Sequence, residues 1–171
     1  CESISVAQTT TFSWTLGSQA APEKPRYIIV GFQTEKDGDQ QKNPSIFDHC
    51  DLKNMFVELN SNRYPAVDYQ LSFPNQQIAR AYRDAATFSE KFYGMDELIT
   101  QSIITPSDYK DLYPLIVFDV SKQSEKLKSS TVDIKIKATF NANVPAGTQA
   151  YAVVISDKFI QMQSDGNKMH V

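Results

Sequence analysis

The fold of this chain is decided by residues 24–71, which read KPRYIIVGFQT (24–34), a polar loop, and FDHCDLKNMFVELNSNRYPAVDYQL (47–71). The first segment contains a continuous apolar run, so residues 26–34 are predicted to form a strand buried on both faces. Residues 52–59 alternate, with Met55, Val57 and Leu59 on one face. These two segments therefore predict two strands joined by a loop of turn-forming residues.

Further strands are predicted on both sides of this segment. Residues 132–140 alternate apolar and polar side chains in the cleanest period-two pattern of the chain, and residues 9–16 are rich in β-branched and aromatic side chains. Short strands are also predicted at 68–73, at 115–120, and at 150–155 and 159–163, the last two as a hairpin turning at 156–158. Together these segments indicate an all-β, antiparallel sandwich of about eight strands.

One helical insertion interrupts the strands. Asn75 is predicted to cap a helix over residues 76–93, with Gly94 as a left-handed stop. A second helical piece is expected over residues 105–112, where Thr105 precedes a proline at the first helical position. The helical insert therefore spans about residues 76–112.

Tyr64-Pro65 is expected to be extended or a turn, because the residue before a proline avoids the helical region.

Length and composition fit one soluble domain of 171 residues. Hydrophobic residues make up 41% of the chain and charged residues 22%, and the net charge is −3. The sequence contains no dense cluster of Lys and Arg residues, so direct nucleic-acid binding is not expected. The longest apolar run, YIIVGF, is far shorter than the roughly 20 residues that a membrane-spanning helix needs, and no membrane span is expected.

The two cysteines, Cys1 and Cys50, leave two alternatives open. A disulfide between them would require a terminal residue to be held in place, whereas a free Cys50 thiol beside a strand is the commoner arrangement and suits a reducing compartment. The free thiol is favoured.

The one cluster that invites a chemical function is Asp48-His49-Cys50-Asp51. Adjacent strand residues point to opposite faces, and no second Cys or His pair supplies further ligands, so a structural hydrogen-bond cluster is favoured over a metal site. Catalysis by Cys50 and His49 would need a third orienting group, and sequence neighbours seldom provide that geometry. The other histidine, His170, lies next to the last residue.

Other chemical motifs are incomplete. Asp37-Gly38-Asp39 resembles the start of a calcium loop, but the glutamate at the twelfth position is missing. Phosphate-binding, dinucleotide-binding and nucleophile-elbow motifs are not found, and the acidic residues form no assignable pair. The sequence therefore predicts no enzyme, no catalytic residue, no cofactor and no metal.

Residues 24–34, 47–68 and 114–160 resemble the double-jelly-roll domain of Polinton/Maverick-type major capsid proteins. The resemblance implies that residues 1–171 form a single jelly-roll domain, the C-terminal half of a longer double-jelly-roll chain. It also implies a homotrimer that builds a pseudo-hexagonal capsomer, contacts with a minor capsid or penton protein, and a location in the virion after assembly in the host cytoplasm or nucleus.

Two further interpretations stay open from the sequence. One is a stand-alone β-sandwich binding module of lectin or receptor-ligand type, and the other is a capsid-derived protein that its host has kept for a different role. A cupin-like enzyme is disfavoured because one internal histidine cannot supply that metal site. For assembly, the expected contact surfaces are the loop at residues 35–44 and the helical insert.

Overall fold

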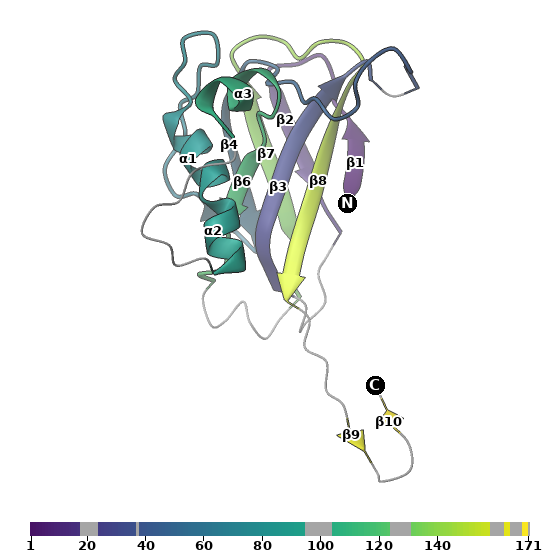
Figure 1. Cartoon of the computed structure of the whole chain (residues 1–171), viewed down its shortest axis with the longest axis vertical. Helices are drawn as coiled ribbons and strands as arrows, with labels where there is room; N and C mark the ends of the chain where they lie inside the picture. The colour runs from purple at the N-terminus through teal and green to yellow at the C-terminus, as the bar shows by residue number, and fades with distance from the viewer. Residues whose placement is uncertain are drawn as a thin grey trace.

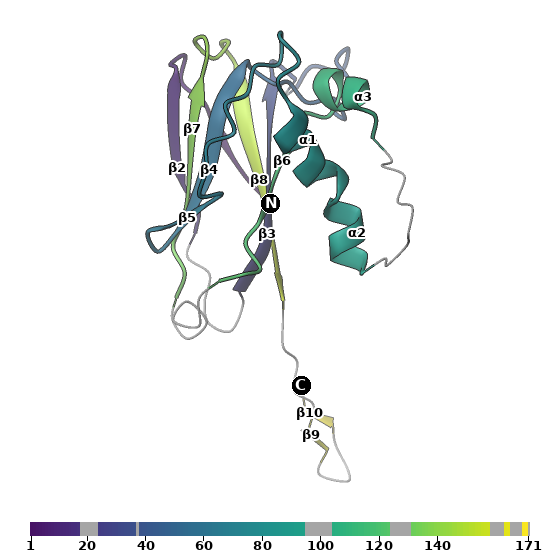
Figure 2. The same ribbon diagram turned by 90° about the vertical axis from the view of Figure 1, so that its left-hand side faces the viewer.

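Two four-stranded antiparallel sheets face one another in the computed structural model (Figures 1 and 2). The structure describes residues 1–17, 24–36, 38–94, 104–123 and 131–157, together with the backbone at 163–164 and 169–170. The first sheet has, in spatial order, β1 (Glu2–Ser5), β8 (Thr148–Asp157), β3 (Lys24–Thr34) and β6 (Ile116–Asp119). The second has β2 (Thr11–Thr15), β7 (Ile134–Phe140), β4 (Leu52–Leu59) and β5 (Asn62–Tyr64).

The connections between the sheets are those of a jelly roll. From β1 to β8 the chain crosses from one sheet to the other at almost every step, and within these two sheets only β4 and β5 are consecutive neighbours. Strands β1 to β8 therefore confirm the predicted eight-stranded, antiparallel jelly-roll sandwich. Two short strands near the C-terminus, β9 (Gln163–Ser164) and β10 (Met169–His170), pair with each other.

The hydrophobic core lies between the sheets and follows the period-two patterns of the sequence. β4 and β7 turn every second residue inward, including Met55, Val57 and Ile136, which are fully buried. Phe32 of β3 bridges the sheets, because its ring lies 5.4 Å from that of Phe140 and 6.3 Å from that of Phe12. Burial of each such side chain stabilises the fold by about 1.5–3 kcal/mol relative to exposure.

The predicted helical insertion lies between β5 and β6 and contains α1 (Ala79–Ala86), α2 (Phe88–Tyr93) and α3 (Pro106–Asp111). Figure 2 shows α1 and α2 alongside the outer face of the first sheet. The rings of Phe88 and Phe92 lie 5.0 Å and 5.9 Å from the ring of Tyr27 on β3. Near Tyr27 the central strand β3 is thus covered on its outer face as well as on its core face, as its unbroken apolar run predicts.

The start of the first helix differs from the prediction. It begins at Ala79 rather than Gln76, and Asn75 donates a hydrogen bond to Ser72 Oγ instead of capping the helix. Gln76 has a φ of +58°, which a right-handed helix cannot include. The helix also breaks at Thr87, so α1 and α2 replace the single predicted helix.

Two of the three helix ends predicted from capping residues are confirmed. Gly94 adopts the left-handed conformation after α2, with φ of +63°. Thr105 caps α3 by accepting a hydrogen bond from the Asp108 N–H.

The predicted strand over residues 68–73 is wrong. This segment turns, with Gln70 at a φ of +51°, and makes one isolated bridge, between Ser72 and Gln77. The strand position beside β4 is taken instead by β5, which follows a tight turn at Asn60-Ser61. The Tyr64–Pro65 peptide bond after β5 is cis.

The predicted hairpin turn at residues 156–158 is also wrong where it is described. Ser156 and Asp157 belong to β8 and pair with Pro25 and Lys24 of β3. Lys158 and the segment 159–162 lie outside the described residues.

Gly31 should not tolerate a larger side chain. A Cβ atom at this position would lie 2.6 Å from Leu115 Cδ2 and 2.7 Å from Phe47 Cδ1. We expect Gly31→Ala to lower the free energy of unfolding by about 1–3 kcal/mol, measured by urea denaturation. Gly17→Ala is the matched control, because its Cβ would meet nothing closer than 3.7 Å. An unchanged midpoint for Gly31→Ala would contradict the packing described here.

Candidate functional site

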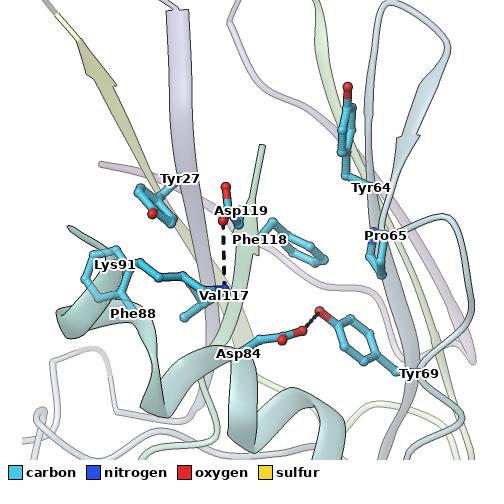
Figure 3. Close-up of a pocket in the computed structure, with 10 residues that line it drawn as sticks. All are labelled: Tyr27, Tyr64, Pro65, Tyr69, Asp84, Phe88, Lys91, Val117, Phe118 and Asp119. Carbon is cyan, nitrogen blue, oxygen red and sulfur yellow. Dashed lines mark hydrogen bonds and ion pairs between the residues drawn. The ribbon is translucent and has the colours of Figure 1, made fainter. Parts of the chain in front are cut away.

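The helical insert and the edge of the sandwich enclose a small cavity of about 100 Å³ (Figure 3). Four of its polar side chains form two pairs. The Tyr69 hydroxyl donates to Asp84 Oδ2 over 3.0 Å, and Lys91 Nζ lies 3.9 Å from Asp119 Oδ2. Burial, with a further contribution from Asp84, raises the pKa of Tyr69, so this hydroxyl remains a hydrogen-bond donor. These contacts around the cavity fix the helical insert to the sandwich.

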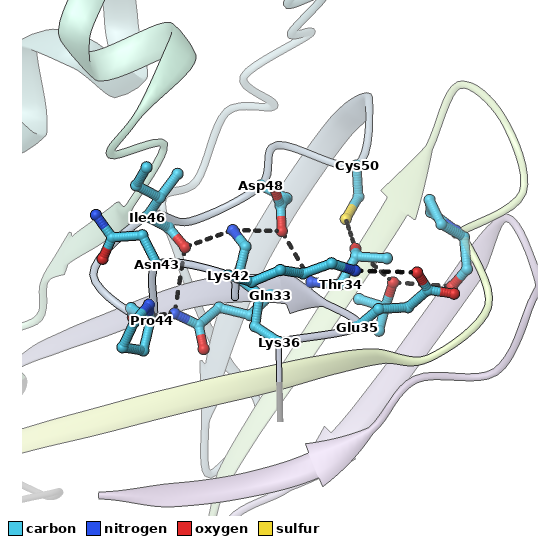
Figure 4. Close-up of polar contacts among 12 residues, drawn as sticks. Gln33, Thr34, Glu35, Lys36, Lys42, Asn43, Pro44, Ile46, Asp48 and Cys50 are labelled. Atoms are coloured by element: carbon cyan, nitrogen blue, oxygen red, sulfur yellow. Dashed lines mark hydrogen bonds and ion pairs between the residues drawn. The ribbon is translucent and has the colours of Figure 1, made fainter. Parts of the chain in front are cut away.

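The predicted contact loop at residues 35–44 is held firmly at its base (Figure 4). The Gln33 amide donates to the carbonyls of Pro44 and Ile46, over 2.6 Å and 3.2 Å. Lys36 Nζ lies 3.0 Å from Asp48 Oδ2, which also accepts the N–H of Thr34 over 2.8 Å. The loop therefore leaves and rejoins the sandwich at fixed points.

His49 lies in the tight turn that leads into β4. Its Nδ1 accepts a hydrogen bond from the Asp51 N–H over 2.9 Å, and its ring stacks on Phe73 at a centroid distance of 4.7 Å. Cys50 and Asp51 both have φ near +50°, and Asn141 holds this turn from the other side by donating to the Asp51 carbonyl. The hydrogen bonds of His49 Nδ1 and of the Asp51 carbonyl therefore stabilise this turn.

Cys50 is a half-buried free thiol, and Cys1 is also free. The Cys50 sulfur lies 3.9 Å from Thr34 Oγ1, on the side of the turn that faces β3. Burial raises the pKa of this thiol to about 11, so it stays protonated near neutral pH. A protonated thiol is a poor nucleophile.

His49, Cys50 and the neighbouring carboxylates line an open depression of about 530 Å³ between the β3–β4 turn, α3 and the β7–β8 loop. Among the described residues, no group of three or more His, Cys, Asp or Glu side chains could hold a metal ion. Asp39 of the calcium-like motif accepts a hydrogen bond from the Gln41 N–H, and Asp37 lies outside the described residues. The side chain of His170 is not described either. The prediction that the chain has no catalytic, cofactor or metal site stays a prediction.

The described helices include none that is long and apolar enough to cross a bilayer.

The strand order β1-β8-β3-β6 facing β2-β7-β4-β5 defines a jelly-roll protein. A family model for a double jelly roll-like domain matches residues 2–160, so the chain belongs to the double jelly roll-like family. This family is structural rather than catalytic, and its fold is that of capsid-type proteins. Comparison with curated proteins and with solved structures finds no significant match.

The stability of the domain should fall as His49 becomes protonated. Burial lowers the pKa of His49 below its usual 6.5, and a proton on Nδ1 would remove the acceptor of the Asp51 N–H. The full contribution is therefore present above pH 6.5 and is lost as the pH falls through the folded-state pKa. Urea midpoints and an NMR titration of the imidazole between pH 8 and pH 5 measure both effects.

The variant His49→Asn is the control for this titration, because its side-chain oxygen can accept the same Asp51 N–H without carrying a proton. It should flatten the pH dependence between pH 7 and pH 5. An imidazole that titrates above pH 6.5 in the folded protein would contradict the prediction.

The two cysteines should differ in reactivity. A pKa of about 11, against an ordinary value of 9.0, makes the thiolate of Cys50 about a hundredfold scarcer at pH 8. Iodoacetamide should therefore modify the exposed Cys1 first, and peptide mass spectrometry would report the order. Equal rates at the two positions would show that Cys50 is not shielded as described.

Proposed function

We propose that this chain is a capsid building block, the C-terminal jelly roll of a double-jelly-roll major capsid protein of the Polinton/Maverick type. The observation that carries the proposal is the family match over residues 2–160 together with the eight-stranded jelly-roll topology. In this role three copies of the longer chain form a pseudo-hexagonal capsomer. The capsomers assemble in the host cytoplasm or nucleus, become part of the virion and meet a minor capsid or penton protein.

The distribution of polar groups supports a structural role. Gln33, Lys36 and Asp48 hold the β3–β4 loop, and the His49 turn satisfies its own hydrogen bonds. At the cavity beside the helical insert, Tyr69 bonds Asp84 and Lys91 pairs with Asp119, so these side chains also hold the framework, as in a rigid domain. A rigid domain with fixed loop bases suits repeated assembly.

Two surfaces are proposed as contacts in this assembly. The loop at residues 35–44 extends from a fixed base, and Lys42 and Glu35 within it form an ion pair of 3.2 Å. The helical insert is fixed to the sheet by the Tyr27 and Tyr69 contacts described above. The described parts of both surfaces are therefore presented in one defined geometry, which reduces the entropic cost of binding a partner.

A binding module of lectin type is the second candidate, and one depression favours it. It has a volume of about 800 Å³ and offers amide and hydroxyl groups from both sides, among them Asn54, Gln77, Asn141 and Thr139. Such groups can hydrogen-bond a sugar. Among the described lining residues, the only aromatic ring is that of Phe140, which is buried in the core and offers no stacking platform.

Expression of the complete reading frame that encodes this chain tests the capsid role. We expect trimers by size-exclusion chromatography with light scattering, and six jelly rolls per trimer by electron microscopy. Monomers at every concentration would count against a capsomer. Binding on a glycan array that Asn54→Ala abolishes, in a monomeric protein, would favour the lectin-type module instead.

A further inference from the structure

The outer faces of the two sheets differ in chemistry. On the second sheet, the outward residues of β7 are Lys135, Lys137 and Thr139, and Lys137 forms an ion pair of 3.0 Å with Glu58 of β4. Arg63 of β5 lies over the outward ring of Phe56, 3.9 Å from its centroid. This is the solvated outer face that an antiparallel sheet normally has.

The first sheet has an apolar outer face along β3 and β8. The register pairs Ile28 with Val154 toward the core, so the neighbouring pairs point outward. These outward pairs are Tyr27 with Ile155, Ile29 with Val153, and Gly31 with Tyr151. None of these side chains carries a charge. An outer face of this kind is usually covered.

The chain itself covers part of this face. Phe88 and Phe92 of α2 pack on Tyr27, and Phe47 and Leu115 close over Gly31. Beyond them, toward the edge strand β1, an apolar strip remains that consists of Ile29, Tyr151, Val153 and Ile155. Val153 is 39% exposed, and the other three side chains are only partly buried.

The residues around this apolar strip would allow the same strip of a second copy of the chain to pack against it. β1 places Ser3 opposite Tyr151 and Ser5 opposite Gln149, so the adjoining surface is small and uncharged. One end of the strip carries both signs of charge, since Arg26 and Asp157 form an exposed ion pair of 3.3 Å. Two copies related by a two-fold axis can exchange these partners, Arg26 of each with Asp157 of the other, without burying an unpaired charge.

We propose that a second copy of this chain packs on the apolar strip, face to face across a two-fold axis. The centre of this contact is apolar and its rim is polar, which is the usual anatomy of a protein interface. The proposed contact would adjoin the packing of α2 on Tyr27. It is additional to the trimer proposed above, which depends on three-fold contacts.

The test compares two lysine variants on opposite faces of the domain. Val153→Lys places a charge in the strip, whereas Thr139→Lys places the same charge on the outer face of the second sheet. Sedimentation of the 171-residue chain from micromolar to millimolar concentration should show a dimer. Val153→Lys should weaken this dimer at least about tenfold, and Thr139→Lys should leave it unchanged.

A second variant controls for the possibility that Val153→Lys disturbs folding. Val153→Thr keeps the β-branched shape, and it should weaken the dimer less than Val153→Lys does while the thermal midpoint stays near that of the parent chain. A monomer at all concentrations would overturn the proposal, and so would a dimer that Val153→Lys leaves intact or that Thr139→Lys weakens equally. None of these results would contradict the proposed trimer of the complete reading frame, which is tested separately.

Discussion

The pairing of β3 with β8 is the constraint on which the rest of the structure depends. It joins residues far apart in sequence, since Thr34 and Thr148 are 114 positions apart and share a hydrogen bond of 2.9 Å between their hydroxyls. β3 then has β8 on one side, β6 on the other, the core beneath it and the helical insert above it. Because this strand is covered in most directions, with Ile29 partly exposed on its outer face, its sequence is apolar almost throughout. The insert and the β3–β4 loop take their positions from it.

The cluster that invited a chemical interpretation serves this framework. His49, Cys50 and Asp51 turn the chain into β4, and each of them interacts with a neighbouring segment: His49 with Phe73, Cys50 with Thr34, and Asp51 with Asn141. In this turn the lone pair of His49 Nδ1 accepts the Asp51 N–H, and burial keeps the Cys50 thiol protonated near neutral pH. The geometry agrees with membership of a structural family.

Periodicity predicted the strands that face the core, because alternation in residues 52–59 and 132–140 directly reports one buried side. It could not predict β1, since Glu2–Ser5 has little apolar character and forms a strand because β8 offers it an edge. The end of β8 was misjudged because Ser156-Asp157 has a turn-like composition, yet it pairs with Lys24 and Pro25. The apolar strip depends on pairing register between distant segments, which no local pattern contains.

The position of β8 also has a consequence for biosynthesis. Until the ribosome has released residues 148–157, β1 and one edge of β3 have no partner, and the YIIVGF segment cannot be covered on that side. Long-range pairings of this kind slow folding and leave unpaired strand edges open to other nascent chains. The sandwich is therefore expected to fold only after β8 has been synthesised, with these strand edges unpaired until then.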